Sequence, residues 1–295
     1  MQALLERIAN GPVLVSDGAM GSLLQSQGLP AGSCPESWCL SRPDVVRGVA
    51  EAYLAAGSDM VLTNSFGGSR LKLASHGLAE RVGELNRAAA MLAREAAGSA
   101  RIVAGSIGPT GRIVEDEGGD ASLADLYEAF REQALALVDG GVDAVCVETM
   151  SSLAEAREAV RAAKAATSVP VFCTFSFSPG RRGFRTMMGV TPELAAREAA
   201  AADADVIGTN CGNGIGNMIE IVRQMREAVP DRPILAQANA GIPELVDGVT
   251  VYAETPEYMS SRVAELVEAG ANVVGGCCGT TPLHMAAIAG AVRGR

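Results

Sequence analysis

Eight short apolar segments recur along the chain, and amphipathic stretches separate them. Several are near-continuous runs of Val and Ile, typical of parallel strands covered on both faces. In the first intervening stretch, Val45, Val49 and Tyr53 recur at helical spacing. The predicted strands are Val13–Ser16, Met60–Thr63, Ile102–Gly105, Ala144–Val147, Val169–Thr174, Asp205–Gly208, Ile234–Ala236 and Asn272–Val274. The predicted helices are Pro43–Ala56, Leu123–Gly140, Leu153–Ala166, Pro192–Ala202, Gly216–Val229, Pro256–Gly270 and Pro282–Val292.

This alternation fits two α/β architectures, a closed (β/α)8 barrel or an open doubly wound sheet. The count of eight strands favours the barrel, and no Gly-x-Gly-x-x-Gly follows the first strand. Three helix-to-strand junctions, at Gly57, Gly141 and Gly270, close the helix with the same glycine device. The length of 295 residues matches one barrel of ~250 residues with modest insertions. We therefore expect residues 1–295 to form a single TIM barrel domain.

Charge and composition exclude several classes of partner. The net charge is −10 and the pI is about 4.8, with no basic stripe, so nucleic acid and anionic membranes are not expected as partners. The first residues show no secretory signal pattern, and no apolar run is long enough to span a membrane. Seven cysteines, an odd number, favour the reducing cytoplasm and metal or catalytic roles over disulfides.

Three cysteines stand where predicted strands end and glycine loops begin. Cys211 follows the sixth strand, and Cys277 and Cys278 follow the eighth. Since the carboxyl ends of barrel strands share one rim, these thiols predict a zinc site with one open position. Alternatives are core packing for Cys211, a vicinal disulfide for the adjacent pair, or a phosphate site at Gly275-Gly276. The other four cysteines, Cys34, Cys39, Cys146 and Cys173, are interpreted as ordinary thiols.

Acidic residues reach the same rim. Glu148 follows an apolar run, and a carboxylate buried there without a partner would be unfavourable, which favours binding of a cationic ligand group. Asp17 follows the first strand, where it is either a site residue or the cap of the next helix. With two histidines in the chain, Ser-His or Cys-His catalysis has little support. Neither lysine, Lys72 nor Lys164, ends a strand, which argues against Schiff-base chemistry.

These strand-end runs resemble those of the homocysteine S-methyltransferase family over nearly the whole chain. The matching runs are Ser16-Asp17-Gly18-Ala19-Met20-Gly21, Asp59-Met60-Val61-Leu62-Thr63-Asn64-Ser65-Phe66, Gly108-Pro109-Thr110-Gly111, Glu148-Thr149, Gly208-Thr209-Asn210-Cys211, Asn239-Ala240-Gly241 and Gly275-Gly276-Cys277-Cys278-Gly279-Thr280-Thr281-Pro282. The resemblance implies a (β/α)8 barrel that methylates the sulfur of L-homocysteine to give methionine. It also implies a catalytic Zn²⁺ and specific roles for the matching residues. By position, the implied zinc ligands are Cys211, Cys277 and Cys278, with Asn239 as a fourth candidate, and the implied substrate contacts are Asp17, Gly18, Thr63 and Glu148.

The methyl donor is read from smaller differences within the family. The Gly279-Thr280-Thr281-Pro282 run resembles the homocysteine module of cobalamin-dependent methionine synthase. Betaine-using members line the donor pocket with aromatic residues, whereas this chain has Cys34, Gly67 and Thr149 there. The chain carries no folate or cobalamin module, so the methyl group is expected from a separate corrinoid protein. The alternatives are betaine- or S-methylmethionine-dependent methylation of homocysteine, or a non-catalytic zinc or thiol-switch barrel.

Overall fold

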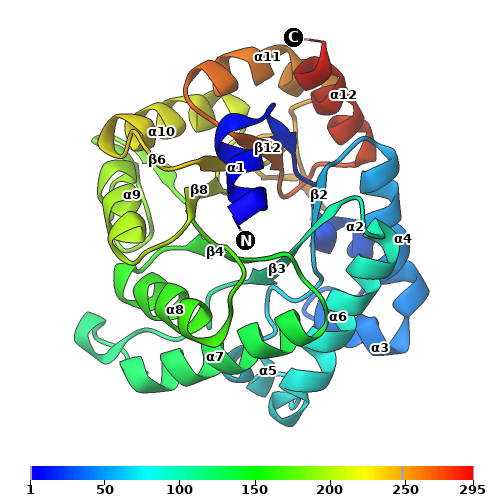
Figure 1. Cartoon of the computed structure of the whole chain (residues 1–295), viewed down its shortest axis with the longest axis vertical. Coiled ribbons are helices and arrows are strands. Elements are labelled where there is room, and N and C mark those ends of the chain that lie inside the picture. Colours follow the sequence, from blue (N-terminus) through cyan, green and yellow to red (C-terminus); the bar gives the residue numbers. More distant parts are fainter. Residues whose placement is uncertain (1, 247–248, 295) are drawn as a thin grey trace.

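In the computed structural model, which describes residues 2–246 and 249–294, eight parallel strands surround a central axis and helices form a ring outside them (Figure 1). The strand order is β1-β12-β9-β8-β5-β4-β3-β2, with β1 paired to β12. Between the end strands β1 and β2, the Asp59 N–H donates to Val15 O at 2.7 Å. Asp59 Oδ2 accepts from the Val15 N–H at 3.0 Å, so this residue joins the two ends of the sheet. The predicted (β/α)8 barrel is confirmed.

All eight predicted strands are present, although several extend further than predicted. The bounds are β1 Leu14–Val15, β2 Met60–Leu62, β3 Ile102–Ile107, β4 Ala144–Met150, β5 Val171–Phe175, β8 Val206–Asn210, β9 Ile234–Ala238 and β12 Val273–Gly276. The added residues of β4 include Glu148, which therefore lies within a strand. Gly275 and Gly276 also lie within their strand, as predicted, and do not form a loop.

The predicted helices are confirmed, and one long helix was missed. The ring consists of α4 Pro43–Ala55, α6 Val82–Ala97, α7 Leu123–Asp139, α8 Leu153–Ala166, α9 Pro192–Ala201, α10 Ile215–Ala228, α11 Pro256–Glu268 and α12 Pro282–Arg293. The missed helix is α6, whose inward face is built largely from alanines such as Ala89, Ala90 and Ala93. Alanine favours a helix but contributes little to an apolar periodicity, so the pattern was weak.

The lower half of the barrel interior is apolar and closed. Leu14, Met60, Ile102, Phe172 and other inward residues form one buried cluster. Helix α1 (Gln2–Asn10) lies across this end of the barrel (Figure 1), and its Ile8 belongs to the same cluster. The polar residues of the interior are therefore concentrated at the carboxyl ends of the strands, as expected for the reactive end of such a barrel.

Several insertions lie at the carboxyl ends of the strands. Between β1 and α4 the chain forms α2 (Met20–Ser26), η1 (Pro35–Ser37) and α3 (Trp38–Ser41). After β2 come α5 (Arg70–Ala74) and η2 (Ala79–Arg81), and after β3 comes η3 (Glu115–Glu117). Two unpredicted hairpins follow β5 and β9, namely β6–β7 (Ser178–Gly180 and Gly183–Arg185) and β10–β11 (Glu244–Val246 and Val249–Val251). Within the described residues, no helix has both the length and the apolar character needed to cross a membrane.

Candidate metal and amino-acid site

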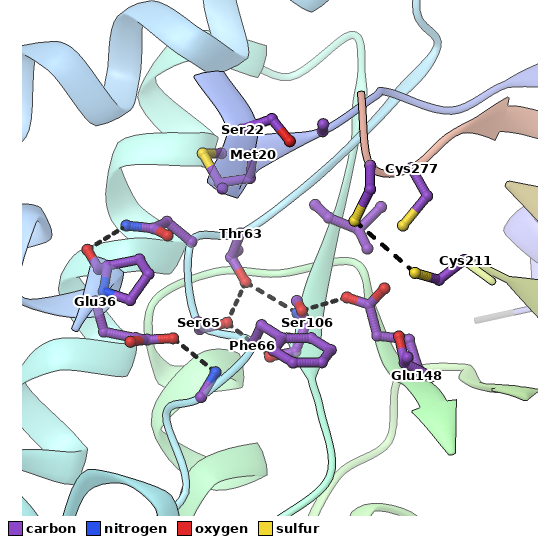
Figure 2. A pocket seen from close by; sticks show the side chains of 18 of the residues that line it. Met20, Ser22, Glu36, Thr63, Ser65, Phe66, Ser106, Glu148, Cys211 and Cys277 are labelled. Carbon is purple, nitrogen blue, oxygen red and sulfur yellow. Dashed lines mark hydrogen bonds between the residues drawn. The ribbon is translucent and has the colours of Figure 1, made fainter. Parts of the chain in front are cut away.

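The three predicted cysteines meet at the carboxyl end of the barrel. Cys211 follows β8, while Cys277 and Cys278 follow β12, and the intervening strand β9 pairs with both. The three Sγ atoms lie within 4.8 Å of one another, and Cys211 Sγ is 3.8 Å from Cys278 Sγ. Figure 2 shows Cys211 and Cys277 projecting toward each other from opposite sides. Two thiolates bound to one tetrahedral zinc at ~2.3 Å each would be ~3.8 Å apart, so the donor set fits this metal.

The backbone around the cysteines continues the sheet and then turns sharply. The Cys211 N–H donates to Gln237 O at 3.1 Å, and the Cys277 N–H donates to Ala238 O at 2.7 Å, so both segments remain bonded to β9. Cys211 itself has φ +59°, a conformation uncommon for a residue with a side chain. At Gly279, with φ +79°, an added Cβ would lie 2.2 Å from the Tyr252 ring, so the turn after the cysteine pair requires glycine.

The cluster stabilises negative charge on sulfur. Hydrogen bonds from the Cys211 and Cys277 thiols lower the pKa of Cys278 to about 3. All three cysteines are half-buried, in contrast to the four others, which are buried. The cluster is therefore accessible to a ligand and holds one thiolate, on Cys278, whereas the pKa of Cys211 is raised to about 11 and that of Cys277 well above its usual value. Thiolate is the form of cysteine that binds metals, so binding of a metal would displace the remaining thiol protons.

Glu148 lies beside this cluster in a buried position. Its side chain is held by two neutral donors: Ser106 Oγ donates to Oε1, and Asn210 Nδ2 donates to Oε2 at 3.2 Å. Burial raises the pKa of Glu148 to about 7. Within the described residues no Lys, Arg or His forms an ion pair with it. A buried carboxylate of this kind is suited to a cationic ligand group, as the sequence predicted.

Asp17 lines the cavity, and the alternative that it caps the next helix is wrong. That helix, α2, has Ala19 as its N-cap residue and no side-chain cap. Asp17 Oδ2 instead accepts from the Leu62 N–H at 2.7 Å across the β1–β2 junction. Burial raises the pKa of Asp17 to about 8, and the nearby negative charge of Glu148 adds to the shift. Both carboxyl groups line the same cavity, and negative charge on Glu148 makes ionisation of Asp17 less favourable.

Of the remaining candidate residues, Thr63 and Gly18 line the cavity and Asn239 does not. Thr63 lines it, and its Oγ1 accepts from the Ser106 N–H at 2.9 Å. Gly18 also lines it, and an added Cβ there would lie 2.6 Å from Thr280 Oγ1, so the close approach requires glycine. Asn239 is buried, does not line the cavity, and has no hydrogen-bond partner for its Oδ1.

A single cavity of about 570 Å³ brings these groups together. Of the eight candidate site residues, all but Asn239 line it, namely Asp17, Gly18, Thr63, Glu148, Cys211, Cys277 and Cys278. Its wall also includes Ser106 and Phe66, which is 41% exposed (Figure 2). The structure thus places seven candidates in one space and adds polar neighbours that the sequence analysis did not assign.

Asn210 is the principal residue that sequence reasoning missed. Its Oδ1 accepts from the Thr149 N–H at 2.8 Å and from Thr174 Oγ1 at 2.7 Å. Its Nδ2 donates to Thr149 Oγ1 at 2.7 Å and to Glu148. Thr149, with φ +63°, is held in the same uncommon conformation as Cys211. Asn210 therefore links the carboxylate to the cysteine cluster, and its place directly before Cys211 was the available signal.

With homocysteine, the acceptor that the sequence resemblance implies, we expect Asn210→Ala to raise the KM about tenfold or more, because Glu148 and Thr149 lose buried partners worth about 1–3 kcal/mol each. Steady-state kinetics and thermal unfolding would be measured together. Asn217→Ala is the matched control, since Asn217 on α10 bonds Asn213 and does not contact Glu148. Equal KM values for Asn210→Ala and the wild type would show that Asn210 does not position the carboxylate.

The fold and the site together define a barrel protein whose reactive end combines a three-thiol metal-type cluster with buried carboxyl groups. A family model described as homocysteine S-methyltransferase matches residues 14–292, and the chain belongs to that family.

Curated relatives are named methionine synthase. That of Mycobacterium tuberculosis is 32% identical over 298 residues, which cover 95% of this chain and 24% of the relative. That of Mycobacterium leprae is 33% identical over 308 residues, covering 98% of this chain and 25% of the relative. The chain thus spans about a quarter of the length of these relatives.

Solved structures support the fold. The metallated form of the homocysteine methyltransferase MmuM from Escherichia coli superimposes with a TM-score of 0.78 at 24% identity, covering 97% of this chain and 98% of MmuM. Its oxidised form gives a TM-score of 0.76 at 22% identity, over 94% of each chain. At this level of identity, the likeness establishes the barrel architecture.

Proposed function

We propose that this chain transfers a methyl group to the thiol of L-homocysteine, giving methionine, and that Cys211, Cys277 and Cys278 hold the Zn²⁺ that binds the substrate sulfur. Family membership and the Cys211–Cys278 separation of 3.8 Å support the proposal. The observation that carries it is the presence, in one cavity, of three thiols suited to zinc and a buried carboxyl group without a cation.

The thiol of free homocysteine, with a pKa of about 8.5, is mostly protonated at neutral pH. Zinc, when bound, would hold this sulfur as thiolate. Three cysteinates give the site net negative charge, so the bound sulfur would remain nucleophilic. No side-chain base is then needed for the sulfur. In agreement, His284 does not line the cavity, and its side chain instead bonds Thr281 in the capping box of α12.

We assign the amino-acid end of the substrate to the polar groups beside the cysteine cluster. Glu148 would bind the ammonium group, since its carboxylate lacks a cation and is fixed by Ser106 and Asn210. Asp17, Gly18 and Thr63 would orient the amino-acid end. Fixed orientation of this kind accounts for a large part of the rate in reactions between two bound groups.

Asn239 remains our candidate for a fourth zinc ligand in the absence of substrate. Its Oδ1 is buried and has no hydrogen-bond partner, which is unfavourable for an amide oxygen unless a ligand or water satisfies it. Zinc accepts oxygen ligands in addition to thiolates. Displacement of this oxygen by the homocysteine sulfur would leave the three cysteines unchanged.

Zinc X-ray absorption with and without homocysteine tests the acceptor half of the proposal. An open catalytic site gains a fourth sulfur scatterer when homocysteine binds, whereas a closed structural zinc does not. An unchanged zinc spectrum at saturating homocysteine would favour the alternative of a non-catalytic zinc or thiol-switch barrel.

For the donor, we propose a methylcorrinoid carried on a separate protein. The similarity to two methionine synthases supports this choice, as does the lack of aromatic residues at Cys34, Gly67 and Thr149. One observation favours the second candidate, a small onium donor such as betaine or S-methylmethionine: the exposed Phe66 ring on the cavity wall, since aromatic faces attract such cations. A panel with homocysteine and methylated corrinoid protein, methylcobalamin, betaine, S-methylmethionine or S-adenosylmethionine separates them by which one yields methionine.

A further inference from the structure

The cavity has an outer end that homocysteine does not need. Figure 2 shows Glu36 on the opposite side of Thr63 and Phe66 from the cysteines. Pockets of about 300–1,000 Å³ hold drug-sized molecules, and the cavity volume of about 570 Å³ falls in this range. Homocysteine, a small amino acid, would occupy the inner end and leave room for part of a second molecule.

Lys72 is the basic side chain of this outer end. Within the described ranges, it is the only Lys or Arg among the residues that line the cavity, and His76 lines it as well. The other lysine of the chain, Lys164, lies between Asp203 and Asp205, at 3.1 Å and 3.2 Å from their carboxylates. In the part of the chain that the structure describes, no carboxylate oxygen lies within 4.0 Å of Lys72 Nζ. Its ammonium group therefore has no protein counter-ion.

Two glycines make room for the Lys72 side chain. A Cβ added to Gly67 would lie 3.3 Å from Lys72 Cγ, and one added to Gly111 would lie 3.4 Å from Nζ. The side chain thus runs from the loop after β2 toward the loop after β3. Its backbone is fixed as well, because the Lys72 N–H donates to Ser69 Oγ, the cap of α5.

The nearby carboxylate of Glu36 is already used by other donors. Its Oε1 accepts from the Gly67 N–H at 2.6 Å, and its Oε2 accepts from Cys34 Sγ at 3.1 Å. Glu36 therefore shapes the loop beside Lys72 and forms no ion pair with it within 4.0 Å. In a chain with net charge −10, a lysine on a cavity wall that has no ion-pair partner within 4.0 Å among the described residues is a local site of attraction for an anion.

We infer that Lys72 binds an anionic group, a carboxylate or a phosphate, carried by the molecule that delivers the methyl group. The identity of the ligand as methyl donor rests on the proposed function, but the anion subsite itself can be measured without it. Replacing Lys72 should then weaken donor binding without changing homocysteine binding or zinc content.

The test compares Lys72→Met, which removes the charge, with Lys72→Arg, which restores it. Arg182→Met is the matched control, because Arg182 lies in the exposed turn of the β6–β7 hairpin and does not line the cavity. Calorimetry would measure the Kd for sodium phosphate and sodium acetate at constant ionic strength. Steady-state assays would measure the KM of betaine, S-methylmethionine and methylated corrinoid protein, with the homocysteine KM and zinc content as internal references.

We expect Lys72→Met to raise the anion Kd and the donor KM about tenfold or more, as for loss of a charge-assisted contact, and Lys72→Arg to restore them. An effect limited to the small donors assigns the anion to a free carboxylate, and an effect on the corrinoid protein assigns it to the carrier. Unchanged Kd and KM values in Lys72→Met would overturn the inference. If no donor yields methionine, the proposed function fails, and the phosphate and acetate measurements still decide the role of Lys72.

Discussion

Replacing any one of Cys211, Cys277 or Cys278 with alanine is expected to abolish zinc retention and reduce methionine formation to background, while the barrel stays folded. Under the proposed function each thiol would supply one of three metal ligands, and the two that remain in a variant would not be expected to hold zinc against a chelator. The cysteines lie beyond the ends of β8 and β12, outside the buried clusters that stabilise the barrel. Zinc analysis after dialysis against EDTA, the methyl-transfer assay and circular dichroism would be measured on each variant.

Cys173→Ala is the control for this set. Cys173 is buried in β5 among residues that face the helices, so its loss makes a small void but leaves the cluster intact. This variant is expected to keep a single zinc ion per chain and normal transfer. Full zinc retention in the double variant of Cys277 and Cys278 would show that the metal, and with it the proposed acceptor site, lies elsewhere.

The affinity for the amino-acid end of the substrate is expected to rise with pH and to level off above about pH 8. Burial raises the pKa of Glu148 to about 7 and that of Asp17 to about 8, so without ligand both groups are largely protonated at pH 6. An ammonium group favours the ionised form, and binding must therefore release protons. Below the pKa, each released proton makes the Kd fall about tenfold per pH unit.

L-Methionine is the suitable ligand for this measurement, because its thioether has no thiol proton to confuse the count. Calorimetry from pH 5.5 to 8.5, in buffers of different ionisation enthalpy, gives the affinity and the protons released. Glu148→Gln is expected to bind more weakly and to lose the component centred near pH 7. A pH-independent Kd for the wild type would exclude the assignment of these carboxyl groups to the ammonium.

The same pKa values imply that the ligand-free fold becomes less stable as pH rises. A carboxyl group whose pKa is raised on folding contributes stability that is fully present below its unfolded pKa and is lost as pH rises through the folded pKa. For Glu148 and Asp17 the loss spans the interval from about pH 4 to about pH 8. A bound amino acid should offset it, so the gain in thermal stability from ligand is expected to grow over this range.

The strands and most helices could be predicted because their signals are local. Apolar runs such as Ala144–Val147 and glycine-closed helix ends such as Gly270 indicate their own local structure. The cysteine cluster was also predictable, since parallel strands in a barrel bring their carboxyl ends to one rim. Helix α6 was missed because alanines on its buried face hide the periodicity. The two hairpins were missed because strands of three residues are too short to show one.

The side-chain partners could not be predicted, because they depend on how neighbouring strands are aligned. Asn210 contacts Glu148 because β4, β5 and β8 pair side by side in a particular register, which cannot be deduced from any one segment. Asp17 was ambiguous for the same reason, since its partner, the Leu62 N–H, lies 45 residues away. Sequence reasoning thus identified which residues reach the rim, and the structure was needed to decide what each one contacts.

Helix α1 closes the end of the barrel opposite to the carboxyl ends of the strands, which bears on how ligands reach the proposed site. Because Ile8 and its apolar neighbours fill that end of the barrel, a ligand of the cavity would enter from the carboxyl ends of the strands. Under the proposed function, acceptor and donor would then both approach the cysteines from the same side of the barrel. The amino end of the barrel would then serve stability, and all exchange of ligands would take place at the carboxyl end.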